Sequence, residues 1–149
     1  DSSCPTFYID TQKILRGTEH RTTCMIRNIP NKYTQAMLRS LIDETHGGLY
    51  DFLYLRMDFK NRCNVGYAFI NFIDPRDIVS FAERIRGKRW ARFNSEKVAD
   101  LTFARIQGKA CLIEKFRRSR VMMEPPSFRP VTFHSSGPKR GQEEAFPLP

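Results

Sequence analysis

The order of predicted strands and helices indicates an α+β fold of the ferredoxin-like type, with a four-stranded antiparallel sheet. Apolar residues alternate with other residues in four short segments, at 22–30, 51–59, 64–72 and 98–106, and this alternation is typical of strands. Between the first and second segments, and between the third and fourth, apolar residues recur with helical spacing. The predicted order is therefore β-α-β-β-α-β, with both helices on one face of the sheet.

Each predicted helix carries its own start and stop signals. Thr34 can cap the first helix and Gly47 can end it, whereas Asp74 followed by Pro75 starts the second helix and Gly87 ends it. The apolar stripes that should face the sheet are Met37, Leu38, Leu41 and Ile42 in the first helix, and Ile78, Val79, Phe81, Ala82 and Ile85 in the second.

Further segments flank the predicted unit, which spans 22–107. Residues 1–21 form a lead-in whose Phe7, Ile9, Ile14 and Leu15 can dock on the core. Residues 108–124 contain a third helix over 109–116, with Leu112, Ile113 and Phe116 on one side. The tail, 125–149, is Pro-rich and resembles disordered segments in composition. We nevertheless expect it to pack on the domain, through the apolar residues Phe128, Val131, Phe133 and Phe146.

The composition favours a polyanionic partner. The chain of 149 residues has 25 Lys and Arg against 16 Asp and Glu, a net charge of +9, which suits nucleic acid or an acidic membrane surface, although a basic protein without such a partner has the same balance. The apolar runs are too short to span a membrane. A missing initial Met and the absence of a signal peptide indicate a piece of a longer protein.

The cysteines and histidines are too scattered for a zinc site, and no other cofactor is indicated. Isolated thiols fit a reducing compartment, so we expect the nucleus and the cytoplasm. These residues are Cys4, Cys24, Cys63, Cys111, His20, His46 and His134.

The segment NVGYAFINF, 64–72, places two aromatic residues on the face that the helices leave open. Alternate residues of a strand share a face, so Gly66, Ala68, Ile70 and Phe72 should pack under the helices. Val65, Tyr67, Phe69 and Asn71 should then look toward solvent. Exposed neighbouring aromatics cost free energy unless a partner covers them. The alternative is a plain buried strand, which the Gly and Ala among the aromatics argue against.

This segment resembles the longer ribonucleoprotein motif of the RNA recognition motif (RRM), in which the third and fifth residues stack on bases. The resemblance assigns those positions to Tyr67 and Phe69. The first position of the motif, normally Lys or Arg, is Val65. Lys60 and Arg62 in the preceding loop could make that phosphate contact instead, or could simply be solvated.

The other strands supply the remaining candidates for RNA binding. The first strand resembles the shorter ribonucleoprotein motif, but Met25 stands where an aromatic is usual, and Met gives a flexible, polarizable contact. The other candidates are Arg27, which can contact a base edge, Asn71 on the third strand, Tyr54 and Arg56 on the second strand, and Arg105 and Gln107 after the fourth.

A more specific resemblance covers residues 7–149. The segments NIPNKYT, DFLYLRMDFKNRCNVGYAFINF, FNSEKVADLTFARIQGKACLIEKF and RPVTFHSSGP together are similar to the C-terminal RRM of the Mei-two-like family of meiosis regulators. This resemblance implies an essential RNA-binding module. It also implies that the lack of an aromatic at Met25 is a family trait.

Two hypotheses follow for the function. The first is binding of single-stranded RNA, a non-coding or messenger RNA, across the sheet, with little or modest sequence specificity, as the RNA-binding module of a meiosis regulator. The alternative is a module that binds a protein or peptide, through the third helix or the helical face, with that helix covering the sheet. We expect the third helix to lie beside the sheet and enlarge the RNA surface. No Ser/His/Asp set, carboxylate pair or metal cluster indicates an enzyme.

Overall fold

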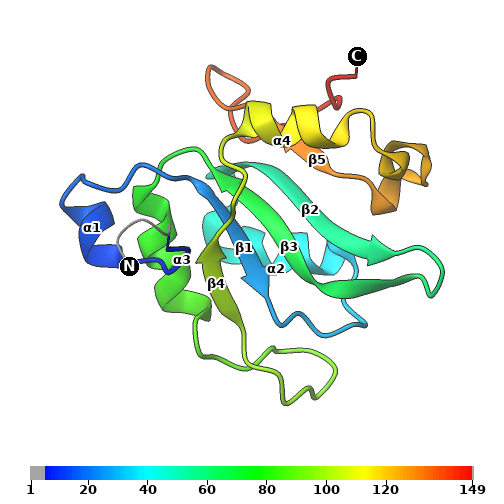
Figure 1. The fold of residues 1–149 in the computed structure, drawn as a ribbon, viewed down its shortest axis with the longest axis horizontal. Helices are drawn as coiled ribbons and strands as arrows, with labels where there is room; N and C mark the ends of the chain where they lie inside the picture. The colour runs from blue at the N-terminus through cyan, green and yellow to red at the C-terminus, as the bar shows by residue number, and fades with distance from the viewer. Residues whose placement is uncertain (1–5, 149) are drawn as a thin grey trace.

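An antiparallel sheet forms the centre of the computed structural model, which describes residues 6–148 (Figure 1). Cys4 and the rest of residues 1–5 in the predicted lead-in, and the last residue of the tail, lie outside the described range. Over the described range the sheet has six strands in the order β4-β1-β3-β2-β5-β6. Their bounds are Thr23–Arg27 (β1), Tyr50–Asp58 (β2), Cys63–Phe72 (β3), Asp100–Phe103 (β4), Val131–Phe133 (β5) and Glu143–Glu144 (β6).

The ferredoxin-like prediction is confirmed, but the sheet is wider than the predicted four strands. The tail adds β5 to the free edge of β2, where Phe52 pairs with Thr132 and Leu53 with Val131. β6 then pairs with β5. Both added strands are two or three residues long, too short for an alternating pattern to be visible in the sequence. The Pro-rich composition of the tail also argues against strands in the same residues.

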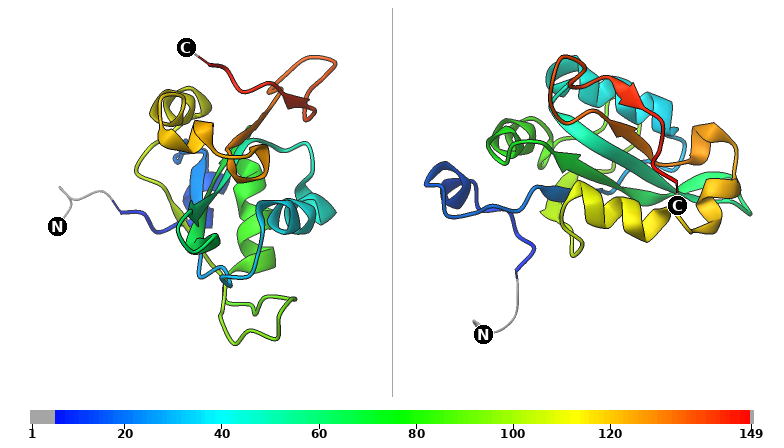
Figure 2. Two further views of the ribbon diagram at one scale, coloured as in Figure 1. Left: turned by 90° about the vertical axis from the view of Figure 1, so that its right-hand side faces the viewer. Right: turned by 90° about the horizontal axis from the view of Figure 1, so that it is seen from above.

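Helices α2 (Gln35–His46) and α3 (Arg76–Ile85) cover one face of the sheet (Figure 2). Thr34 caps α2, because its hydroxyl oxygen accepts a hydrogen bond of 3.1 Å from the backbone N–H of Met37. A carboxylate oxygen of Asp74 accepts one of 2.9 Å from the N–H of Arg76 at the start of α3. The core between this face and the two helices includes Leu38, Ile42, Phe72, Ile78, Phe81, Ile70 and Ala68.

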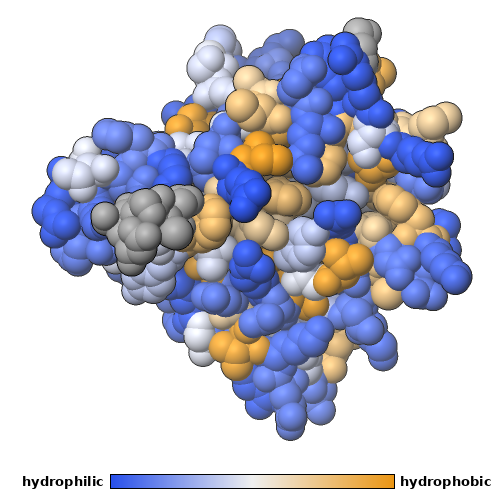
Figure 3. Space-filling model, viewed as in Figure 1, coloured by the Kyte–Doolittle hydropathy of each residue, from blue (hydrophilic) through white to orange (hydrophobic). Residues whose placement is uncertain are grey.

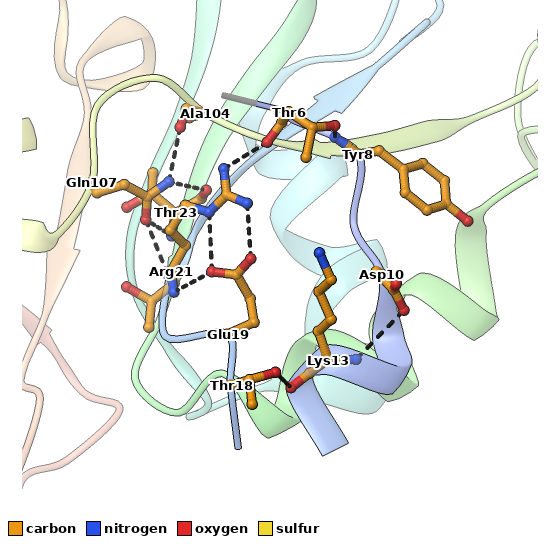
Figure 4. A network of polar contacts seen from close by, with 11 residues as sticks. Thr6, Tyr8, Asp10, Lys13, Thr18, Glu19, Arg21, Thr23, Ala104 and Gln107 are labelled. Atoms are coloured by element: carbon orange, nitrogen blue, oxygen red, sulfur yellow. Dashed lines mark hydrogen bonds and ion pairs between the residues drawn. The ribbon is translucent and has the colours of Figure 1, made fainter. Parts of the chain in front are cut away.

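The described part of the lead-in packs at the edge of this layer. Its short helix α1 (Thr11–Leu15) lies beside α3 (Figure 1), and Ile9 and Ile14 are buried. Leu15, which we expected to dock, is 60% exposed, because α1 turns only one side toward the core. Arg21 follows and forms an ion pair of 2.8 Å with Glu19 (Figure 4).

The third predicted helix, α4 (Lys109–Phe116), lies on the opposite face of the sheet from α2 and α3 (Figure 2). Its boundaries match the prediction. The short 3₁₀ segments η1 (Arg120–Met123) and η2 (Pro126–Phe128) follow it and lead the chain toward β5. A second apolar cluster, separate from the main core, lies between α4 and the sheet.

A line of polar contacts ties the tail and α4 to the sheet. Asp51 is buried, and its two carboxylate oxygens accept hydrogen bonds of 2.8 Å from Asn71 Nδ2 and Ser135 Oγ. Lys109 at the start of α4 donates to the carbonyl of Phe133 at 2.7 Å and forms an ion pair of 2.7 Å with Glu144. Buried charges and amides of this kind hold their partners in place because an unpaired group would cost free energy.

Candidate nucleic-acid interface

The candidate residues lie on or around the face opposite α2 and α3, and α4 divides this face into a covered and an open part. The prediction that α4 lies beside the sheet is wrong. The Phe116 ring packs on Phe52, Tyr54 and Phe69, at centroid separations of 6.0, 5.0 and 5.9 Å. The part of the face formed by β2 and the carboxyl-terminal half of β3 is therefore occupied by the chain itself.

The expected exposure of Phe69 is consequently corrected. Phe69 does project from the open face, as the alternation of β3 predicts, but it is only 8% exposed because Phe116 covers it. Tyr54 also points to this face and is 3% exposed. Burial raises the pKa of the Tyr54 hydroxyl above its usual value. Neither ring can stack on a base while α4 is docked.

Two further candidates, Asn71 and Gln107, are committed to structural hydrogen bonds. The Asn71 side chain accepts hydrogen bonds from the Thr22 and Thr23 hydroxyls at 2.8 and 2.7 Å and donates to Asp51. Gln107 accepts from the backbone N–H of both threonines and donates to the carbonyls of Thr23 and Ala104 (Figure 4). Their side chains are thus used to fix the start of β1 and the connection to α4.

The open part of the face has a smaller set of side chains, which we call the open platform: Met25, Arg27, Tyr67 and Thr102. Arg27 stands opposite Tyr67 across β1 and β3, and its Nε donates to the Thr102 hydroxyl at 3.0 Å. Met25 and Tyr67 are half-buried and Arg27 is exposed. These side chains offer one aromatic ring, a thioether and a guanidinium on one surface.

Arg56 holds the Tyr67 ring in position at the border of the platform. Its Nη1 donates a hydrogen bond of 2.7 Å to the Tyr67 oxygen, and Arg56 itself is exposed. The Tyr67 and Phe69 rings meet edge to face at 5.9 Å. Tyr67 is therefore fixed on one side by a buried ring and on the other by a cation, which lowers the entropy lost when it binds a flat partner.

Gly66 of the NVGYAFINF segment has a backbone reason for its identity. Its φ is +103°, a conformation that side chains disfavour. Its carbonyl accepts from the Ile29 N–H at 2.9 Å and its own N–H donates to Asn64 at 2.8 Å. The glycine permits an irregularity in β3 just before Tyr67, and the register of β2 against β3 shifts nearby, between Leu55 and Met57.

The loop and exit cations lie around the sheet rather than on it. Lys60 and Arg105 are exposed. The Arg62 guanidinium lies 4.8 Å from the centre of the Phe128 ring, a cation–π contact that attaches the β2–β3 turn to the tail. Arg62 is thus partly used by the fold, whereas Lys60 and Arg105 remain available for a phosphate.

Figure 3 shows this face in space-filling form, with apolar side chains in its middle interrupted and edged by hydrophilic ones. Such a surface, with a fixed aromatic ring among cations, suits an unpaired nucleotide, whose base has an apolar face and whose backbone is anionic. Among the described residues there is no group of three or more His, Cys, Asp or Glu side chains that could hold a metal ion. The described helices include none with the length and apolarity needed to cross a membrane.

Sequence reasoning missed Phe52 on this face, and it considered a sheet covered by the helix of Phe116 only as the alternative hypothesis. Phe52 is fully buried on the covered part of the face, and the helical spacing of Phe116 indicates only that it belongs to an apolar stripe. Two features of the sequence indicate the covered sheet. Phe52, Tyr54 and Phe69 lie on one face, and a connection of only five residues, 104–108, separates β4 from α4. A connection that short keeps an amphipathic helix near the sheet, and three aromatics there would need a cover.

The comparison with protein families decides the classification. The model described as "RNA recognition motif 2" matches residues 21–117. The chain belongs to the RNA recognition motif 2 family. The match spans β1 to β4 and includes α4, so the covering helix lies within the part that the RNA recognition motif 2 family shares.

Curated relatives match nearly the whole chain. It is 58% identical to Protein MEI2-like 1 of Arabidopsis thaliana and 58% identical to Meiosis protein mei2 of Schizosaccharomyces pombe, in each case over 95% of this chain. Protein MEI2-like 4 of Oryza sativa is 55% identical over the same share. The chain covers 16%, 19% and 14% of these proteins. This member of the RNA recognition motif 2 family therefore spans less than a fifth of their length.

A solved structure supports the fold. The RRM of Rna15 with bound RNA (GU) superposes with a TM-score of 0.50 at 17% identity, over 62% of this chain and 93% of that chain. At this identity the likeness concerns the fold alone. The part of the RNA recognition motif 2 chain without a counterpart there accounts for over a third of its length.

Proposed function

We propose that this chain is a module that binds single-stranded RNA on the open platform of its sheet, with little or modest sequence specificity. One observation carries the proposal: Tyr67 is a half-buried ring on the sheet face, fixed by Arg56 and paired with the exposed Arg27. Stacking on such a ring is worth roughly 1–3 kcal/mol per base and tolerates any base. The net charge of +9 favours the phosphate backbone in the same way for every sequence.

The RRM fold and the family support a binding role rather than a catalytic one. The solved RRM of Rna15 holds bound RNA, and the family model carries RNA recognition in its description. We expect fewer stacked bases than in an RRM with three exposed aromatics, because Phe69 and Tyr54 are covered. The expected contacts are one base on Tyr67, a second against Met25 and Arg27, and phosphates near Arg56, Lys60 and Arg105.

The test is fluorescence anisotropy with a short labelled RNA of random sequence and two matched variants. Tyr67→Ala should weaken binding roughly ten-fold, which corresponds to about 1.4 kcal/mol. Tyr8→Ala removes a tyrosine that is 66% exposed in the lead-in and should leave the affinity unchanged. Equal affinities of the two variants would show that RNA, if bound, does not use the sheet.

A second candidate function has one observation in its favour. Phe116 seals three aromatics of the sheet, as expected of a protein- or peptide-binding RRM whose sheet is covered by a helix. Backbone amide shifts in NMR spectra separate the two functions. Under this second candidate, addition of RNA leaves the amides of Arg27 and Tyr67 unmoved, whereas RNA binding on the open platform shifts both.

We further propose that the module acts within a longer regulator of meiosis, present in nucleus and cytoplasm. The support is the name of the Schizosaccharomyces pombe protein, Meiosis protein mei2, and its 58% identity to this chain. Replacing the matching segment of that protein with this chain should preserve meiosis, and the Tyr67→Ala version of the replacement should not. Fluorescent tagging of the replaced protein tests the location.

A further inference from the structure

The two flanks of α4 differ in what they contact. The flank that includes Lys109, Ile113 and Arg117 faces the tail. Lys109 contacts Phe133 and Glu144, and Arg117 donates to the carbonyl of Leu148 at 2.9 Å. This flank is therefore occupied by the chain's own β5, β6 and Leu148.

The opposite flank faces the open platform. With 100° per residue, and with Leu112 and Phe116 directed at the sheet, Cys111, Lys115 and Arg118 lie on the side away from the tail. All three are exposed. Since β3 and β1 lie on that side of β2 in the sheet order, this flank forms the border of the open platform.

Lys115 stands close to the border itself. Its Nζ lies 5.6 Å from the centre of the Phe116 ring. That ring lies 5.9 Å from Phe69, which pairs with Met25 of the platform. One short chain of contacts thus connects the Lys115 ammonium to the platform.

On this flank Lys115 has no acidic partner in the described part of the chain, and the one ion pair of Arg118 there is long and exposed. Among the described residues, Lys115 has no carboxylate within 4.0 Å, and the only one at that distance from Arg118 is Glu114, at 4.0 Å. Arg27 belongs to the open platform and Arg56 stands at its border, so cations lie on the platform as well as on this flank of α4. Such a surface attracts a polyanion more strongly than separated charges do.

We propose that the platform-side flank of α4 is a second wall of the RNA site, on which Lys115 and Arg118 bind phosphates of the strand whose bases lie on the open platform. The inference rests on the proposed function and deepens it. The helix that removes Phe69 and Tyr54 from the binding surface would thereby supply backbone contacts in their place. The recognition gained is independent of sequence, because phosphates carry no base identity.

The expected size of the effect follows from counterion release. Each phosphate neutralised on a single strand contributes about 0.7 to the slope of log affinity against log salt. Loss of two contacts should lower the slope by about 1.4, and at about 0.15 M salt this corresponds to roughly ten-fold weaker binding. A purely structural role of the two residues would change stability but not the slope.

The experiment compares two double variants of equal charge, titrated with a short labelled RNA of random sequence at several salt concentrations. Lys115→Ala with Arg118→Ala removes the proposed wall. Lys88→Ala with Arg92→Ala removes two exposed cations from the loop between α3 and β4. Thermal unfolding of both double variants checks that they are folded, and Tyr67→Ala is measured beside them.

The outcomes separate the two proposals. The inference predicts the lower slope and weaker binding for the wall variant alone. If Tyr67→Ala weakens binding but the wall and loop variants behave alike, the wall is overturned and the platform stands. If Tyr67→Ala has no effect, the platform proposal fails, and the wall fails with it because its phosphates belong to the same strand.

Discussion

Removal of the Phe116 ring is the sharpest test of the covering helix. The side chain is 7% exposed and touches three aromatic rings of the sheet. A buried Phe removes about 150 Å² or more from water, worth near 4 kcal/mol at about 25 cal/mol per Å². Phe→Ala substitutions in cores typically cost about 3–5 kcal/mol. We expect Phe116→Ala to lower the free energy of unfolding by about 3 kcal/mol, because α4 lies at the edge of the molecule and can relax.

The assay is urea denaturation followed by circular dichroism, with Cys111→Ala as the control on the same helix. Cys111 is exposed and its substitution should change stability by less than about 0.5 kcal/mol. A loss of about 3 kcal/mol also corresponds to a melting temperature roughly 6–12 °C lower for a chain of this size. If Phe116→Ala stays within about 1 kcal/mol of the wild type, α4 does not pack on the sheet through this ring, and Phe69 and Tyr54 are accessible after all.

Three further substitutions test other parts of the structure. A hydrogen bond from Arg21 lowers the pKa of Glu19 from 4.5 to about 2, so the ion pair stabilises the fold above pH 4.5 and this contribution is lost as the pH falls toward 2. Glu19→Gln should therefore be less stable by about 1–3 kcal/mol near neutral pH, and the difference should vanish in acid unfolding curves near pH 2; a constant difference would contradict the pairing. Thr34→Ala should cost about 1 kcal/mol in urea unfolding while Thr34→Ser stays near the wild type, and similar losses for both would exclude a capping role. Lys109→Met keeps the apolar stem but loses the ion pair with Glu144. It should lower the unfolding free energy by about 1–3 kcal/mol and speed proteolysis of the tail. Unchanged proteolysis would mean that other contacts hold the tail.

The sequence was sufficient for the parts of the fold that depend on periodicity. The alternation around Tyr67 and the stripes of α2 and α3 each reflect one buried face. They predicted both the elements and the side of the sheet that each residue occupies. The boundaries of α4 were also predictable, since Gly108 precedes it and its apolar residues repeat with helical spacing.

Periodicity does not report the position of α4, for which the crowded aromatics and the short connection were the only signal. An apolar stripe indicates that a helix packs against another element, but both the open face of the sheet and a neighbouring edge could be that element. The choice depends on three-dimensional packing of Phe116 against residues over forty positions earlier in the chain. For the same reason Phe69 was predicted on the correct face but with the wrong exposure. The added strands of the tail depend on pairing with the edge of β2, which no local pattern reports.

The buried Asp51 has a consequence for where this module can be cut. The family match ends at residue 117, yet one oxygen of Asp51 is bound by Ser135, eighty-four positions further on. A protein shortened to the matched span would expose the lateral backbone groups of β2 and leave that carboxylate without its second donor. We therefore expect the smallest stably folded unit to be longer than the matched span, because a chain ending there leaves β2 as an unpaired edge strand that favours aggregation.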